Sequence, residues 1–249
     1  MTDTTSTQST GQVVAPRVTF LGESASYRST LGMYKIDENG LIYDVEIIFA
    51  DTSDVESGGS LISGETSVEL NVGAGDNVGF FVMPDAYSLN DEAAFNADRY
   101  ELRDWGGSLG NIYDDTALRR YAIDDTTGES TLVDARWNAA TWHMHHNEQA
   151  GIDMNSDGTD HAKGHIQYDG SVSIGFSDVY GSGDGRMDAL LINVNFGTSG
   201  AVIVDSGMAT GTDQTEEVWI SPTDIQEGLP EVPVAVVERN TNGSQEENV

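Results

Sequence analysis

The stretch "LIYDVEIIFA", residues 41–50, decides the fold class that the sequence predicts. It is rich in β-branched and aromatic residues and has turn signals on both sides, which is typical of a β-strand. Two similar runs follow, "TSVELNV" (66–72) and "NVGFFVMP" (77–84). The connection between them, "GAGD" (73–76), contains two glycines and predicts a hairpin.

Short runs of the same kind continue through most of the chain. They begin with "RVTFL" (17–21) and end with "AVIVD" (201–205), and the pair Asp169-Gly170 between two such runs is a further hairpin signal. Only residues 89–105 have a helical composition, and because they lack a periodic apolar face we expect one short helix there. The sequence therefore predicts an all-β protein, a β-sandwich or jelly roll with at most one or two short helices.

The chain divides into one structured domain and two polar ends. Residues 1–15 are rich in Ser and Thr, and we expect them to form a flexible arm. Residues 16–205 contain the strand-like runs without an internal repeat, so we expect one β-sandwich domain. Residues 206–249 form a C-terminal extension that we expect to be partly flexible.

The composition excludes several classes of function. The chain has 42 acidic and 11 basic residues and a formal net charge of −31, which argues against binding to nucleic acid or to an anionic membrane. No apolar run approaches the roughly 20 residues needed to cross a bilayer, so we expect no membrane insertion. The absence of cysteine excludes disulfides and thiolate zinc sites. Two explanations of the negative net charge remain: the surface is adapted to salt, or the carboxylates are neutralised by bound cations.

The stretch "GIDMNSDGTDHAKGH", residues 151–165, begins like an EF-hand calcium loop. It follows the pattern D-x-[DN]-x-[DN]-G, but its twelfth position is Gly164 where an EF-hand has glutamate. No amphipathic helix flanks it either, so it is a calcium loop of another fold or an ordinary polar turn. The first predicted calcium site consists of Asp153, Asn155, Asp157 and Asp160.

A second acidic cluster lies in "GFSDVYGSGDGRMDALLINVNFG", residues 175–197. Its carboxylates alternate with glycines, which let the backbone fold tightly so that several oxygens can converge on one cation. One such loop is as often a plain Asp/Gly turn, but two in so acidic a chain favour a metal. Calcium is favoured over magnesium because flexible, oxygen-rich loops suit its larger coordination shell. The second predicted calcium site consists of Asp178, Asp184 and Asp188.

Residues 20–50, 58–85, 154–161 and 173–197 resemble, in that order, the segments of a bacterial family. It is a domain-of-unknown-function family found in large calcium-dependent repeats-in-toxin adhesins and related secreted surface proteins. The resemblance runs from about Phe20 to Gly197 and is loose in the middle. It implies a calcium-bound β-sandwich that acts as a ligand-binding or structural module without catalysis.

The family's motifs fall on individual residues of this chain. Its D-G-x-D-H pattern falls on residues 157–161 and implies that His161 lies beside the first calcium loop. Its G-E-S-A-x-Y motif implies Glu23 as a further metal ligand. Arg186 and Ala189 stand where the family usually has carboxylates. An arginine there would weaken the second calcium site, or take the place of the cation by pairing with Asp184 or Asp178.

All five histidines lie between residues 143 and 165. His143 and His145 would share one face of a strand, which would suit a zinc site or a pH switch. We favour the simpler interpretation, in which this is an ordinary polar strand. Flat aromatic side chains suit sugar rings, and Trp105 is the best exposed candidate because it lies among turn residues. The predicted ligand-binding residues are Trp105, Trp142 and His161.

The motifs of hydrolases, zinc proteases and nucleotide-binding enzymes do not occur in the chain. We therefore expect a non-enzymatic, calcium-dependent surface recognition module, adhesin-like, that binds a glycan or peptide on a cell surface. One alternative is a structural spike, fibre or decoration subunit of a phage-like particle, bound to neighbouring subunits. Another is a polysaccharide-active enzyme, because a catalytic carboxylate pair is defined by distance in space.

The N-terminus lacks the basic and apolar regions of a Sec signal peptide. This leaves a cytoplasmic protein, a chain exported by a route that reads its C-terminus, or a component of a particle. The resemblance to the adhesin family implies the cell surface or the extracellular space, reached by non-Sec export. The particle interpretation instead predicts the surface of a virion or virus-like particle.

Overall fold

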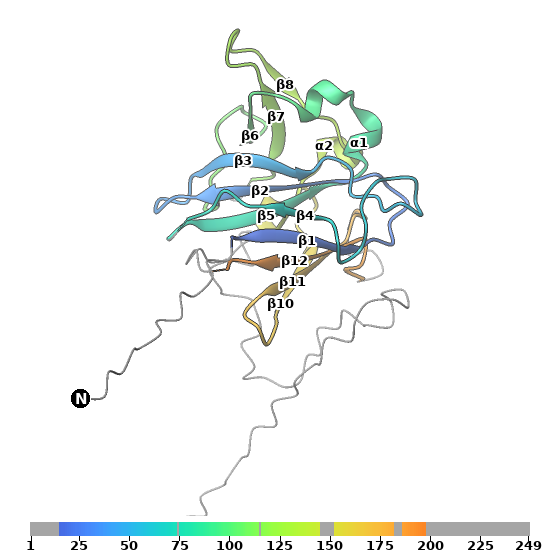
Figure 1. The fold of residues 1–249 in the computed structure, drawn as a ribbon. Coiled ribbons are helices and arrows are strands. Elements are labelled where there is room, and N and C mark those ends of the chain that lie inside the picture. The colour runs from blue at the N-terminus through green and yellow to red at the C-terminus, as the bar shows by residue number, and fades with distance from the viewer. Residues whose placement is uncertain (1–14, 74, 115, 145–151, 182–185, 198–249) are drawn as a thin grey trace, which may run out of the picture.

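The computed structural model describes residues 15–73, 75–114, 116–144, 152–181 and 186–197. In this part of the chain two antiparallel sheets pack against each other (Figure 1). The predicted all-β sandwich is therefore confirmed. The predicted arm before residue 15, the predicted strand at 201–205 and the C-terminal extension lie outside the described residues.

The first sheet has five strands: β1 (Arg17–Gly22), β4 (Ser67–Glu69), β10 (Ala162–Ile166), β11 (Val172–Phe176) and β12 (Leu190–Asn195). They lie in the order β10-β11-β12-β1-β4. Ile174 lies opposite Ile192, and Val18 lies opposite Val194. All four side chains are buried in the core between the sheets. The predicted hairpin at Asp169-Gly170 is confirmed, because it joins β10 to β11.

The second sheet has seven strands: β2 (Thr30–Ile36), β3 (Ile42–Phe49), β5 (Asn77–Met83), β6 (Arg99–Arg103), β7 (Arg119–Ile123), β8 (Ser130–Leu132) and β9 (Trp142–Met144). They lie in the order β8-β7-β6-β3-β2-β5-β9. Strands β6, β7 and β8 extend beyond β3, away from the five-stranded sheet (Figure 1).

The predicted hairpin between residues 66–72 and 77–84 is wrong. Strand β4 pairs with β1 in the first sheet, whereas β5 pairs with β2 in the second. The connection therefore crosses between the sheets, and Leu70 and Val78, on either side of it, both belong to the core that the sheets share. A glycine-rich connection of this length fits either arrangement, and the burial of both runs decides for the crossover.

Three short helices have four residues each: α1 (Ala86–Leu89), η1 (Glu92–Phe95) and α2 (Arg136–Ala139). The segment 89–105, predicted to contain a short helix, begins with the last residue of α1 and contains η1, which is a 3₁₀ helix. The segment continues as β6, which pairs with β7 along its whole length. Strand pairing therefore overrides the helical composition there.

The seven-stranded sheet curls into a half-barrel because β3 is bulged. Its register with β2 shifts twice, and Asp44, within the second shift, has a φ of 44°. Bulges increase the local twist of a strand. Among the described residues, β3 is paired with β6 at one position, where Val45 lies opposite Tyr100. The three outer strands can therefore turn away from the plane of the rest.

Apolar cores lie on both faces of the seven-stranded sheet. In β5 the side chain of Phe80 points into the core between the sheets and that of Phe81 into the core inside the curl. The core between the sheets includes Phe20, Leu31, Met33, Phe80 and Phe176. The core inside the curl includes Tyr34, Phe81, Leu102, Leu118 and Met154.

Two glycines make room for the aromatic rings inside the curl. Gly32 lies opposite Phe81 in the strand pair, and Gly79 lies opposite Tyr34. A Cβ atom on Gly32 would lie 2.2 Å from the Phe81 ring, and one on Gly79 would lie 2.4 Å from the Tyr34 ring. The two rings stack with their centres 6.2 Å apart. Each ring thus fills the space that the opposite glycine leaves.

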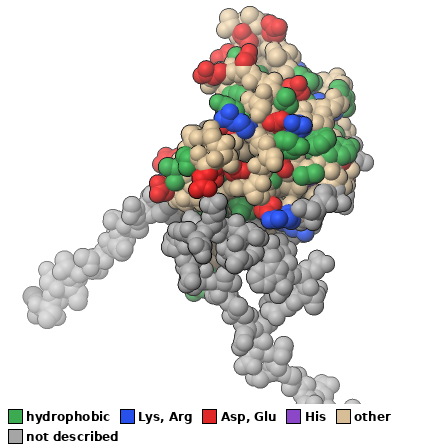
Figure 2. Space-filling view, turned by 90° about the vertical axis from the view of Figure 1, so that its right-hand side faces the viewer, with side chains coloured by type: hydrophobic (Ala, Val, Ile, Leu, Met, Phe, Trp, Pro, Cys, Tyr) green, Lys and Arg blue, Asp and Glu red, His purple; other side chains and the backbone are tan. Residues whose placement is uncertain are grey.

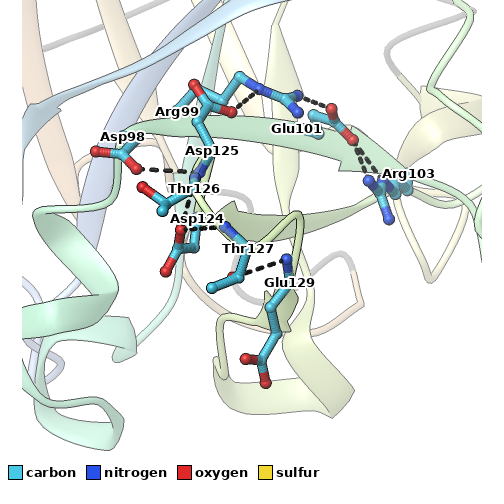
Figure 3. Close-up of polar contacts among 9 residues, drawn as sticks. All are labelled: Asp98, Arg99, Glu101, Arg103, Asp124, Asp125, Thr126, Thr127 and Glu129. Carbon is cyan, nitrogen blue, oxygen red and sulfur yellow. Dashed lines mark hydrogen bonds and ion pairs between the residues drawn. The ribbon is translucent and has the colours of Figure 1, made fainter.

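Most of the acidic side chains drawn on β6 and its neighbouring turns accept hydrogen bonds (Figure 3). Arg99 pairs with Glu101 and donates from Nε to Asp125 at 2.7 Å. Arg103 donates from Nε to Glu101 at 2.6 Å, and Asp124 accepts two backbone N–H groups in the turn before β8. This acidic region is therefore held by internal contacts and needs no cation.

Acidic side chains are spread over the face shown in Figure 2, where basic side chains form small separate groups.

In the described ranges, no helix is both long enough and apolar enough to span a bilayer.

We expect Gly79→Ala to lower the free energy of unfolding by about 1–3 kcal/mol, because the added methyl group overlaps the Tyr34 ring. Urea denaturation measures this. Gly73→Ala is the matched control, since a Cβ atom there meets nothing within 4 Å, and its effect should stay within about 0.5 kcal/mol. An equal loss in both variants would contradict the packing of Tyr34 against Gly79.

Candidate functional site

Segments that are far apart in the sequence meet around a cavity of about 460 Å³. Three of its aromatic side chains are exposed: Trp105 by 62%, Tyr180 by 49% and Trp137 by 38%. Large aromatic side chains that stay exposed around one cavity indicate a binding site. The cavity is lined by Trp105, Ala117, Arg119, Trp137, Asn138, Ser156 and Tyr180.

The curl of the seven-stranded sheet brings these segments together. Leu118, just before β7, accepts a hydrogen bond on its carbonyl from Thr141 Oγ1 at 2.8 Å. Its N–H donates to the carbonyl of Met154 at 3.3 Å. Trp105 follows β6, whose end pairs with the start of β7. The cavity therefore lies at the end of the half-barrel where β7 returns towards β9.

One wall of the cavity has a strained backbone. Trp137, Asn138 and Ala139 have φ values of 58°, 67° and 58°, so α2 is left-handed over these three residues. None of them is glycine, and each left-handed residue costs roughly 1–2 kcal/mol. The turn places the Trp137 ring 5.6 Å from that of Tyr180. Strain of this kind persists where the surroundings enforce it, and it often occurs at binding sites.

Arg119 joins two walls of the cavity. Its Nε donates to the carbonyl of Asn138 at 3.1 Å, and its guanidinium carbon lies 3.2 Å from the centre of the Trp105 ring. The residue is 3% exposed, and burial lowers the pKa of its guanidinium because the charged form loses its water. Its Nη1 is buried without a hydrogen-bond partner.

Buried aromatic rings support the cavity from behind. Trp142 and His161 stack with ring centres 3.9 Å apart and an angle of 11° between the planes. The ring of Tyr180, on the cavity wall, lies 6.3 Å from that of Trp142. Of the three predicted ligand-binding residues, Trp105 therefore lines the cavity. Trp142 and His161 have no exposed surface and lie behind it.

The carboxylate of Asp157 connects the two loops that the sequence predicts to bind calcium. It accepts the N–H of Gly181 at 2.6 Å and lies 2.9 Å from Nε2 of His161. Burial by itself would raise the pKa of Asp157, but these two contacts outweigh it, and the pKa is lowered. Burial also lowers the pKa of His161, more than the neighbouring Asp157 raises it. The pair is therefore an aspartate that accepts from a neutral imidazole.

The other residues of the first predicted calcium site also contact protein groups. Asn155 accepts a backbone N–H at 2.9 Å and donates to a backbone carbonyl at 2.7 Å. Asp160 accepts a backbone N–H at 3.1 Å. Asp153 also interacts with another group of the chain. No group of three or more histidine or carboxylate side chains that could hold a metal occurs among the described residues. The side chains of this loop are thus hydrogen-bonded within the protein, and calcium binding by them stays a prediction.

Two buried carboxylate oxygens, Oδ2 of Asp178 in the second predicted calcium site and Oε1 of the further predicted ligand Glu23, have no hydrogen-bond partner among the described residues. Asp178 is 5% exposed. Burial, followed by the charges of Glu23, Asp188 and Asp85, raises the pKa of Asp178 to about 6. These carboxylates are therefore near enough to repel one another, and a cation would relieve the repulsion. The fourth predicted ligand, Asp184, lies outside the described residues.

Glu23 and Asp188 are brought together by the backbone. Ser24, next to Glu23, donates its N–H and its Oγ to the carbonyl of Asp188 at 3.1 Å and 3.0 Å. Arg186 pairs with the carboxylate of Asp188. An arginine of the second loop therefore contacts one of the predicted ligands, although not Asp178. The oxygen atoms of Glu23, Asp178 and Asp188 are hard donors of the kind that calcium prefers.

The histidines of the predicted zinc alternative lie in different surroundings. His143 is buried, contacts Thr141 Oγ1 at 2.7 Å and packs against the rings of Tyr34 and Phe81. His165 is exposed on β10. The remaining two predicted members, at 145 and 146, lie outside the described residues.

Sequence reasoning missed Arg119, Asn138 and Ser156 as members of the site. Asn138 and Ser156 carry no signal, because polar residues in turns are common. Arg119 does carry a sequence signal, because it is followed directly by Arg120 and adjacent arginines stand out in a chain with 11 basic residues among 249.

Neither protein-family models, nor curated proteins, nor solved structures gave a match to this chain. The resemblance to the repeats-in-toxin adhesin family therefore stays a prediction.

We expect Asp178→Asn to raise the free energy of unfolding in EDTA at pH 7.5, by about 1–3 kcal/mol. The folded pKa of about 6 lies above the unfolded value, which is about 4. The protonated carboxyl therefore stabilises the fold at low pH, and this contribution is lost as the pH rises through 6. Asparagine keeps the neutral form at every pH, so its advantage should fall by about half at pH 5.0.

Chemical denaturation at the two pH values measures this difference. The exposed Glu38→Gln is the control for the removal of one negative charge. A lower free energy of unfolding for Asp178→Asn at pH 7.5 would contradict the conclusion that the ionised carboxylate of Asp178 destabilises the fold. An equal rise in the free energy of unfolding for Glu38→Gln would contradict it as well.

Proposed function

We propose that this protein is a non-enzymatic, calcium-dependent recognition module that binds a glycan in the aromatic cavity. The observation that carries the proposal is the convergence of Trp105, Trp137 and Tyr180 on one cavity. We further propose that it acts outside the cell, where calcium is abundant and surface glycans are found.

Aromatic side chains of this kind favour a sugar over a peptide as ligand. The flat faces of Trp and Tyr can cover the apolar C–H faces of a pyranose ring. Asn138 and Ser156 supply hydrogen-bonding groups to the same cavity. The volume of about 460 Å³ falls within the range of small-ligand sites.

The described lining of the cavity contains no carboxylate. Hydrolysis of a glycosidic bond generally requires two carboxyl groups on either side of the scissile bond. Binding without hydrolysis is therefore better supported than the polysaccharide-active alternative. No observation favours the particle-subunit alternative, which an oligomeric state in solution would reveal.

Asp178 and Asp188 of the second predicted site, with Glu23, would contribute oxygen ligands to the calcium ion, and the described residues hold no group of three such side chains already arranged around a metal. The ion would supply positive charge beside the buried Asp178, whose carboxylate Glu23 and Asp188 repel. Tyr180 lies two residues after Asp178 and directly before Gly181, whose N–H donates to Asp157. The calcium ion at Asp178 and the hydrogen bond from Gly181 would then fix the two ends of this short turn. The position of Tyr180 in the cavity wall would be fixed as a result.

We expect the full-length chain to bind members of a glycan panel in millimolar calcium and to lose that binding in EDTA. Tyr180→Ala should weaken binding by about 10-fold, because it removes one stacking ring. Tyr168→Ala is the matched control, since Tyr168 is 89% exposed and lies in the β10–β11 turn, outside the cavity lining.

Three results would contradict the proposal. They are the absence of glycan binding by the wild-type chain, an equal loss of binding in both tyrosine variants, and the release of shorter saccharides from the bound glycan.

A further inference from the structure

We propose that Arg119 makes the cavity selective for a pyranose that carries a carboxylate, as uronic and sialic acids do. The inference rests on the proposed function, because it names the class of glycan that the same cavity takes. It follows from one cation in the cavity wall that has no partner of opposite charge among the described residues.

Arg119 differs from most other arginines of the chain. Six arginines within the described ranges lie within ion-pair distance of a carboxylate: Arg17, Arg28, Arg99, Arg103, Arg136 and Arg186. Arg119 has no such partner among the described residues, although the chain has 42 acidic residues. Arg120 has none either, but it is fully buried between the rings of Phe95 and Tyr100 and does not line the cavity.

The hydrogen-bond donors of Arg119 are only partly used. Nε donates to the carbonyl of Asn138, while the buried Nη1 has no partner. Leaving a buried donor unpaired is unfavourable, and a ligand that supplies an acceptor removes that penalty. Ser156, which lines the same cavity, has a buried Oγ without a partner as well. Two polar groups of one cavity are therefore without a hydrogen-bond partner among the described residues.

A carboxylate suits this arginine better than a neutral hydroxyl does. The guanidinium is a planar fork whose N–H groups match the two oxygens of a carboxylate, and hydrogen bonds between charged partners are about twice as strong as neutral ones. Burial among Trp105 and its neighbours reduces the competition from water. A carboxylate held there would leave the sugar ring beside the aromatic walls.

The charge of the whole chain narrows the class further. A net charge of −31 repels anions at long range, but salt screens this repulsion beyond about 8 Å at physiological ionic strength. A densely charged sulfated chain would still meet more of this repulsion than a ligand that has a single negative charge at the arginine. The ligand with one charge is therefore favoured. Trp105 is 62% exposed and lies in a turn next to Gly106 and Gly107, so the ring that covers Arg119 borders the solvent from which the ligand enters.

The test compares matched probes on the wild-type chain in calcium at 0.15 M NaCl. Methyl β-D-glucuronoside and methyl β-D-glucoside differ only by the carboxylate in place of the hydroxymethyl group, and titration calorimetry or ligand-detected NMR measures their Kd. We expect the acid to bind about 10-fold or more tightly than the neutral sugar. The methyl glycoside of N-acetylneuraminic acid, tested in parallel, distinguishes a sialic acid from a uronic acid as the source of the carboxylate.

Arg119→Gln should abolish the preference for the acid while binding of the neutral glucoside remains. Arg17→Gln is the matched control, because it removes the same charge from an exposed position on β1, and it should keep the preference. If Arg119→Gln does not fold, as judged by its thermal unfolding, the comparison of the two probes on the wild-type chain still decides.

Equal affinities for the two sugars would overturn the inference and leave the proposed function standing. Binding of neither sugar nor of any glycan on the panel would overturn both. Tighter binding of a sulfated disaccharide, or of the acidic peptide acetyl-glycyl-glycine, than of the glucuronoside would also overturn it, since the arginine would then serve another class of ligand.

Discussion

The buried carboxylate of Asp157 holds together the loops on which the candidate site is built. It accepts the N–H of Gly181 at 2.6 Å and contacts His161 at 2.9 Å. His161 in turn stacks on Trp142, and the Tyr180 ring lies 6.3 Å from that of Trp142. Because these hydrogen bonds outweigh burial and lower the pKa of Asp157, the carboxylate stays ionised in the interior. The position of Tyr180 on the cavity wall depends on this junction.

The curl of the seven-stranded sheet is the second condition for the cavity. Bulges in β3 let the outer strands turn, and the rings of Tyr34 and Phe81 fill the inside of the curl. The start of β7 then comes close to β9, which places Arg119 beside the left-handed turn at Trp137. The surrounding core and the hydrogen bond from Arg119 hold that strained turn in place, so packing energy of the fold maintains the shape of the binding wall.

The sequence predicted the fold class better than the site. Strand-like runs such as residues 41–50 became strands because their β-branched and aromatic side chains are buried on both faces of the curled sheet. The calcium motif at 153–160 was recognised from spacing, but spacing does not reveal that His161 and Gly181 satisfy its central aspartate. The cavity could not be predicted at all, since its walls come from loops that only the curl brings together.

Calcium binding by the buried carboxylates is the central claim, and thermal unfolding of the full-length chain tests it most directly. The melting temperature is measured in EDTA and then with calcium, magnesium or zinc at constant ionic strength. A ligand that binds only the native state raises the melting temperature. The account predicts a rise that is largest with calcium and is lost in Asp178→Asn. Equal rises with calcium and magnesium, or no rise with calcium, would contradict it.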